Sequence, residues 1–151
     1  VSSKSGAWNT REKPDRVTAK LAALHYYQLS MPAPKAPAGS YDKAAFERGK
    51  AVFNGAGKCA TCHVPPLFTE PGHNLHSPGE LGLDSFQADR SPTRMYRTAP
   101  LAGLWTHQKG GFFHDGRFAT LPDVVNHYDQ QFKLQLTPQN KTDLVEYLKG
   151  I

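Results

Sequence analysis

One short segment constrains this 151-residue chain more than any other feature: Cys59-Ala60-Thr61-Cys62-His63. Two cysteines three positions apart, followed directly by a histidine, form the C-x-x-C-H sequence at which a c-type haem is attached. The two thiols can form thioethers with the vinyl groups of one porphyrin, and the adjacent imidazole is then the proximal iron ligand. Because the segment uses both cysteines of the chain, we predict one covalent haem c, attached through Cys59 and Cys62 and ligated by His63.

Other uses of a cysteine pair fit this segment less well. A disulfide between Cys59 and Cys62 would close a very small loop and leave His63 without a role. A zinc site would need His73 and His76 as further ligands, and their spacing departs from the zinc-finger pattern. A redox-active C-x-x-C usually opens a helix after a strand, and no such pattern precedes Cys59. Haem attachment is therefore the interpretation that the residues favour.

The composition agrees with a domain completed by a cofactor. Hydrophobic residues make up 38% of the chain, which also holds 13 glycines and 12 prolines, so a large apolar group would supply part of the core. The formal net charge of +5 is too diffuse to indicate nucleic-acid binding, and it predicts instead a weakly basic surface that meets an acidic redox partner protein. No hydrophobic run is long enough to span a membrane.

The start of the chain and the haem motif together suggest a compartment. Val1 stands where an initiating methionine is absent, so we expect either that a targeting segment has been removed or that the sequence is a fragment. Covalent haem attachment takes place outside the cytoplasm, which predicts an exported protein of the bacterial periplasm.

One domain with an N-terminal extension is expected, with a boundary near residue 39. Residues 1–39 comprise a polar arm, a helix that begins at Asp15, and a linker with three prolines between Pro32 and Pro37. Such a linker is extended and semi-rigid. Residues 40–151 form the haem domain.

The haem domain is expected to be mostly α-helical and cytochrome c-like. Helices are predicted over 41–53 with Ser40 as N-cap, over 121–130 with Thr120 as N-cap, and from Pro138 to the end with Thr137 as N-cap. The first and last of these helices should cross where Gly49 meets Tyr147. No periodic pattern continues between residues 64 and 105, which predicts long irregular loops wrapped around the haem.

Four segments of the haem domain resemble one protein family, the bacterial di-haem cytochrome c peroxidases and their methylamine-dehydrogenase-maturing relatives. The resemblance is to the C-terminal haem domain of these proteins, and it covers residues 40–151 in the right order. The segments are RGKAVF at 48–53, CATCHVPPLFT at 59–69, YRTAPLAGLW at 96–105 and GFFHDGRFATL at 111–121.

The chain departs from that family in one respect, because the family carries two C-x-x-C-H motifs and this sequence has one. The resemblance implies the electron-delivering half of the enzyme, so we expect a mono-haem domain that transfers electrons. Whether it is an enzyme stays open. The alternatives are a peroxidase-like enzyme or small-ligand sensor with an open distal site, or a fragment of a larger di-haem protein whose other haem domain is its partner.

The resemblance also suggests the ligands of the iron. Pro100 lies in the segment that matches a Pro-x-Leu sequence of cytochromes c, whose carbonyl accepts a hydrogen bond from the proximal histidine. Tyr128 occupies the place of a tyrosine ligand in the methylamine-dehydrogenase-maturing relatives, and we favour it as the distal ligand. Met95, His76, another histidine or an open site are the alternatives.

Further pocket residues are expected from the same segments. Arg97 and Arg117 can pair with the haem propionates, because the guanidinium fork matches a carboxylate, although either can equally be a surface charge. His114 is expected near a propionate or in a turn, and Trp105 is expected to pack in the haem pocket.

Overall fold

The computed structural model describes residues 14–70, 74–107 and 109–151. The chain divides into two compact units, Val1–Ala33 and Pro34–Ile151. In the first unit a 3-10 turn over Thr18–Lys20 leads into helix α1, Leu21–Ser30, and its described residues are all exposed. The helix expected from Asp15 is thus present, with its α-helical part beginning six residues later.

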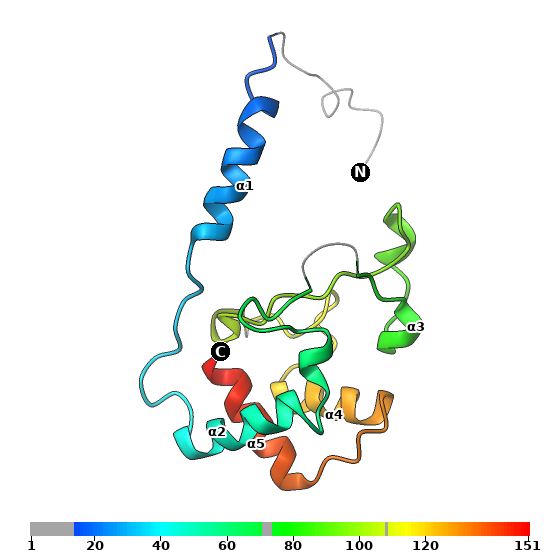
Figure 1. The fold of residues 1–151 in the computed structure, drawn as a ribbon. Helices are drawn as coiled ribbons and strands as arrows, with labels where there is room; N and C mark the ends of the chain where they lie inside the picture. Colours follow the sequence, from blue (N-terminus) through cyan, green and yellow to red (C-terminus); the bar gives the residue numbers. More distant parts are fainter. Residues whose placement is uncertain (1–13, 71–73, 108) are drawn as a thin grey trace. The chain divides into compact units, whose positions relative to one another are not determined.

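The second unit is built from helices and loops (Figure 1). Its longer helices are α2, Lys43–Asn54, α4, Leu121–Gln131, and α5, Pro138–Gly150. Among the described residues no strand forms, and the extended contacts there are the isolated bridges His76–Tyr96 and Phe112–Phe118. The mostly α fold class is therefore confirmed. No helix in the described part of the chain is long and apolar enough to cross a bilayer.

The N-caps set where these helices begin. Thr120 and Asp123 form the predicted capping box of α4, and the Thr137 hydroxyl accepts a hydrogen bond from the Asn140 N–H at the start of α5. The expected cap of α2 was wrong. Asp42, not Ser40, caps α2 by accepting a 2.7 Å hydrogen bond from the Ala45 N–H. The negative charge of Asp42 is a further advantage at a helix N-terminus.

Helices α2 and α5 cross at Gly49, as the sequence predicts. A Cβ atom at Gly49 would lie 2.0 Å from the Asp143 carbonyl oxygen and 2.8 Å from Cβ of Tyr147. Only a residue without a side chain permits so close an approach of two helix backbones. Beside this contact the Arg48 guanidinium donates two hydrogen bonds to the buried Asp143 carboxylate, at 2.8 and 2.7 Å.

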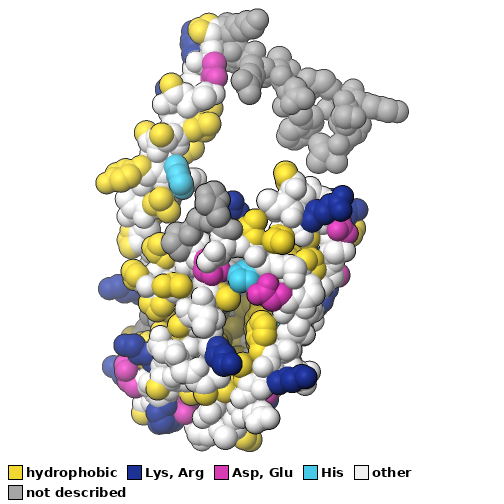
Figure 2. All heavy atoms as spheres, turned by 45° about the vertical axis from the view of Figure 1, so that its right-hand side comes forward, with side chains coloured by type: hydrophobic (Ala, Val, Ile, Leu, Met, Phe, Trp, Pro, Cys, Tyr) yellow, Lys and Arg dark blue, Asp and Glu magenta, His cyan; other side chains and the backbone are white. Residues whose placement is uncertain are grey.

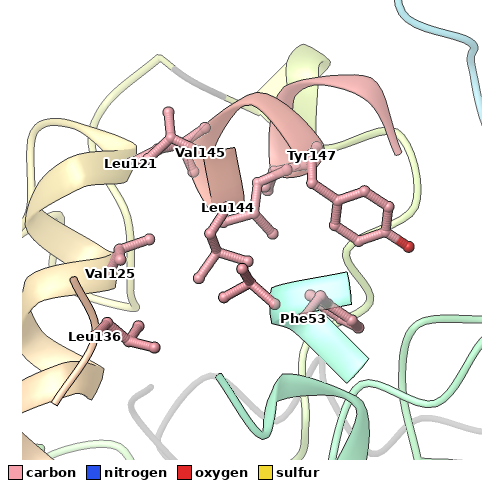
Figure 3. Close-up of a cluster of buried hydrophobic side chains, with 10 residues drawn as sticks. Phe53, Leu121, Val125, Leu136, Leu144, Val145 and Tyr147 are labelled. Carbon is pink, nitrogen blue, oxygen red and sulfur yellow. The ribbon is translucent and has the colours of Figure 1, made fainter. Parts of the chain in front are cut away.

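Three helices share one apolar core (Figure 3). Tyr147 of α5 packs against Phe53 of α2, with ring centroids 5.1 Å apart, and Phe53 is completely buried. Leu121 and Val125 of α4 lie on the other side of α5. These residues fall on the stripes expected from helical periodicity, so the core positions of α2, α4 and α5 follow from the sequence.

The region from 64 to 105 is irregular, as expected, with one exception. Residues Pro78–Leu81 form the short helix α3, and the Ser77 hydroxyl accepts a hydrogen bond from the Glu80 N–H at its start. Ser77 and Glu80 fit the S-x-x-E capping pattern, which is a sequence signal for the start of this helix.

Candidate haem attachment site

Cys59 begins a short 3-10 turn, Cys59–Thr61, that follows α2 and a tight turn, and Cys62 is the C-cap of that turn. Lys58, immediately before it, adopts the left-handed conformation with φ of 52°, and the His63 N–H donates to the Cys59 carbonyl at 2.9 Å. Cys59 and Ala60 pack against the apolar core. The core thus fixes one end of the segment, and both thiols are free of a disulfide.

The environment of the thiols argues against disulfide exchange as their role. Burial raises the pKa of Cys59 to about 11, and burial also raises the pKa of Cys62. Exchange-active C-x-x-C pairs show the opposite shift, because the thiolate is the attacking species.

The imidazole of His63 is oriented by a backbone carbonyl. Its Nδ1 lies 3.1 Å from the Phe68 carbonyl oxygen, which also accepts a hydrogen bond from the Leu101 N–H at 3.2 Å. We expected the Pro100 carbonyl to accept this hydrogen bond. In the structure, the carbonyl within hydrogen-bond distance of Nδ1 is that of Phe68. Phe68 reaches the ring because it adopts a left-handed turn, with φ of 53°, which no sequence pattern indicated.

The protonation of His63 suits a ligand. Burial lowers the pKa of His63 from its ordinary value, against the opposing effect of hydrogen bonding to Phe68 and Ala99. The ring is therefore neutral near pH 7. With Nδ1 at the Phe68 carbonyl, the other ring nitrogen is left for a metal, as in other histidine-ligated sites.

Tyr128 of α4 lies close to the attachment segment. Burial raises the pKa of its phenol to about 12, and the charges that Cys62 and Cys59 carry when ionised act in the same direction. The ring is set in an aromatic cluster: Phe113 lies 5.8 Å away, and Phe132 is stacked on it at 5.7 Å. The structure thus brings the expected distal ligand near the two cysteines.

The alternative distal ligands have other surroundings. The two ring nitrogens of His76 lie 2.7 Å from Glu70 Oε2 and 2.9 Å from Glu80 Oε1, so both are engaged. Met95 is 42% exposed. His73 lies outside the described residues.

The expected propionate partners take part in a local charge network. Arg117 pairs with Asp84 and Asp115, and Nε2 of His114 lies 3.2 Å from Asp84. Arg97 is exposed. Contact of any of these side chains with a propionate stays a prediction.

Trp105 contacts the proline-rich linker. Its indole N–H donates a 3.0 Å hydrogen bond to the Pro34 carbonyl, and the side chain lines a surface pocket with Pro37, Ser40 and Lys149. Pro34 is the first residue of the second unit. Packing of Trp105 against a haem is a prediction that the structure leaves untested.

A cluster around Glu70 was missed by sequence reasoning. Its side chain is only 9% exposed and accepts hydrogen bonds from Thr98 Oγ1 at 2.7 Å and Asn74 Nδ2 at 3.0 Å, besides its contact with His76. The one signal in the sequence was a charged residue two positions after the apolar pair Leu67 and Phe68.

The donor set fits a covalent haem. Two free thiols and a neutral imidazole with one nitrogen available lie within one five-residue segment, and the half-buried phenol of Tyr128 is the oxygen donor proposed to complete the set. Figure 2 shows a recess on this unit with hydrophobic walls, below a histidine and acidic side chains. A mostly helical domain with a C-x-x-C-H segment against its core is of the cytochrome c-like class.

One curated relative makes the resemblance more specific. The chain is 28% identical, over 93% of its length, to the methylamine utilization protein MauG of Methylorubrum extorquens. The chain spans 46% of that protein, about half of its length. The similarity supports a relationship to haem-containing, cytochrome c peroxidase-like proteins. No protein-family model and no solved structure matches the chain.

Proposed function

We propose that residues 34–151 form a mono-haem c-type cytochrome domain that transfers electrons. The observation that carries this proposal is the attachment segment itself, with both thiols free at the edge of the core and His63 oriented by the Phe68 carbonyl. Cys59 and Cys62 would hold the porphyrin through thioethers, and His63 would ligate the iron. When bound, the haem supplies a one-electron Fe(III)/Fe(II) couple.

The ligand on the distal side of the haem determines whether the Fe(III)/Fe(II) couple transfers electrons or reacts with a molecule at the iron. A filled distal position favours electron transfer over reaction at the iron, and Tyr128 is the side chain we propose for it. Its burial and its closeness to both cysteines support the assignment. An oxygen ligand of this kind stabilises the ferric state, so we expect a low reduction potential. A redox protein partner and a periplasmic location belong to the same proposal.

The spectrum of the haem protein tests the assignment. Intact-mass measurement should show one covalent haem, and ferric absorption and EPR spectra of the wild type should differ from those of Tyr128→Phe in spin state and ligand type. Tyr41→Phe is the matched control, because it loses the same hydroxyl from a half-buried ring that packs against Phe46, with ring centroids 5.0 Å apart. Identical spectra for Tyr128→Phe and wild type would exclude Tyr128 as a ligand, and a protein without covalent haem would refute the proposal.

A further inference from the structure

The carbonyl that orients His63 belongs to Phe68, whose backbone conformation is unfavourable for a residue with a side chain. Phe68 has φ of 53°, in the left-handed region where residues with a Cβ atom are strained. Such residues persist where the surrounding structure over-determines them. Residues 62–70 contain no α-helix. The Phe68 N–H donates to the Val64 carbonyl at 2.8 Å within a local turn, and further constraint comes from a neighbouring loop.

Contacts with one other loop provide that constraint. The Leu101 N–H donates to the Phe68 carbonyl at 3.2 Å, the Thr69 hydroxyl donates to the Thr98 carbonyl at 2.6 Å, and the Thr98 hydroxyl donates to Glu70 Oε2 at 2.7 Å. Three consecutive residues, 68 to 70, are therefore each tied to the segment 98–101. We call this set of hydrogen bonds the loop clamp.

Glu70 is the only charged member of the loop clamp, and it joins the clamp to a third segment. Its carboxylate also contacts the ring of His76 at 2.7 Å, and the His76 backbone forms a two-way bridge with Tyr96, at 2.9 and 2.8 Å. A carboxylate with three side-chain partners and 9% exposure is fixed in place. Hydrogen bonds to a charged acceptor are also stronger than neutral ones.

We propose that Glu70 is a positioning residue for the iron ligand: through Thr98 it holds the Phe68 carbonyl against Nδ1 of His63. The inference rests on the proposed haem attachment. A firm hydrogen bond at Nδ1 fixes the orientation of the imidazole and raises its basicity as a ligand. The clamp thereby lowers the reduction potential of the haem without contacting the iron.

Thr98 offers the cleanest test, because its hydroxyl can be removed without changing any charge. Thr98→Val keeps the shape and loses the hydrogen bond to Glu70, while Thr98→Ser keeps the hydroxyl. In the haem-loaded protein we expect Thr98→Val to raise the reduction potential and to shift the ferric EPR g values. Thr98→Ser should restore both to the wild-type values.

Glu70→Gln and Glu80→Gln form a matched pair. Each removes one negative charge beside the same histidine, but Glu80 contacts Nδ1 of His76 and takes no part in the loop clamp. Loss of charge alone would raise the potential in both variants. The proposal requires a larger rise in Glu70→Gln, together with a change in g values that Glu80→Gln does not show.

The outcomes separate this inference from the proposed function. If the wild type carries no covalent haem by mass, the proposed function fails. If haem is attached, and Thr98→Val has the potential and g values of the wild type, Glu70 does not position His63 and the inference is overturned. Equal effects of Glu70→Gln and Glu80→Gln would overturn it as well. Loss of haem from Thr98→Val but not from Thr98→Ser would support the clamp.

Discussion

The crossing of α2 and α5 and the loops around His63 belong to one compact unit, and different forces hold them. At the crossing, apolar side chains are buried between helices, with Phe53 at 0% exposure and Tyr147 at 3%. Around His63 the loops are tied by single hydrogen bonds such as that between Thr98 and Glu70. The helical core is thus stabilised by many non-directional apolar contacts, and the loops depend in addition on a few directional hydrogen bonds.

This difference has a consequence for function. Burial of apolar area is non-directional, so it sets the position of a helix without specifying the direction of any one polar atom. A hydrogen bond depends on angle and distance, and it can aim a carbonyl at Nδ1 of His63. We expect core substitutions to change stability most, and loop substitutions to change the properties of the haem at smaller cost in stability.

The largest loss of stability should follow Phe53→Ala. Replacing a fully buried phenylalanine by alanine removes apolar contact and leaves a cavity, at a typical cost of about 3–5 kcal/mol. Chemical unfolding of the haem protein measures this cost. Phe86→Ala is the control, because Phe86 is 61% exposed and has mainly the Arg90 guanidinium 3.7 Å above its ring. A similar loss in both variants would contradict the core shown in Figure 3.

A smaller loss is expected from Gly49→Ala. The added methyl group would lie 2.0 Å from the Asp143 carbonyl oxygen, so α2 and α5 must move apart, and overpacking of this kind costs about 1–3 kcal/mol. The midpoint of denaturant unfolding reports the change. Gly79→Ala is its matched control, since a Cβ there meets nothing within 4 Å. If Gly49→Ala were as stable as Gly79→Ala, the close crossing would be refuted.

The core could be predicted from the sequence because its signals are periodic or local. The stripes of α2, α4 and α5 repeat at helical spacing, and Thr120 and Thr137 precede their helices as N-caps. A glycine on an apolar helix face predicts a close helix crossing, and the resemblance to small c-type cytochromes, where a glycine of the first helix meets an aromatic residue of the last, suggested Tyr147 as the partner of Gly49. Asp42 in place of Ser40 is an error of two residues at one helix end.

The loops around His63 could not be predicted in the same way. The hydrogen bond between Thr98 and Glu70 joins residues 28 positions apart, and no periodic pattern connects them. The left-handed conformation of Phe68 runs against the preference of a residue with a Cβ atom. That Phe68, and not Pro100, is the hydrogen-bond partner of His63 depends on this long-range hydrogen bond and on this backbone conformation. It could therefore be found only from the structure.

The smallest expected effect on stability concerns the pH dependence of the Glu70–His76 pair. Hydrogen bonding to His76, and then to Thr98, lowers the pKa of Glu70 from its ordinary 4.5 to about 2. The carboxylate therefore stabilises the folded state above pH 4.5, and this contribution declines as the pH falls toward 2. Glu70 and then Glu80 raise the pKa of His76 above its ordinary 6.5. The protonated ring stabilises the fold below pH 6.5, and that contribution is lost as the pH rises through the raised pKa.

Both contributions are complete only between the two ordinary values, pH 4.5 and 6.5. The difference in unfolding free energy between wild type and Glu70→Gln should therefore be largest in this window and smaller on either side. Its size should be about 1 kcal/mol, the usual net contribution of a hydrogen bond to stability. The corresponding difference for Phe53→Ala should be nearly constant over the same pH range, because that substitution removes no titrating group. A flat profile for Glu70→Gln would mean that the negative charge of Glu70 adds nothing to the stability of the loops, and that a neutral amide can replace the carboxylate in its hydrogen bonds.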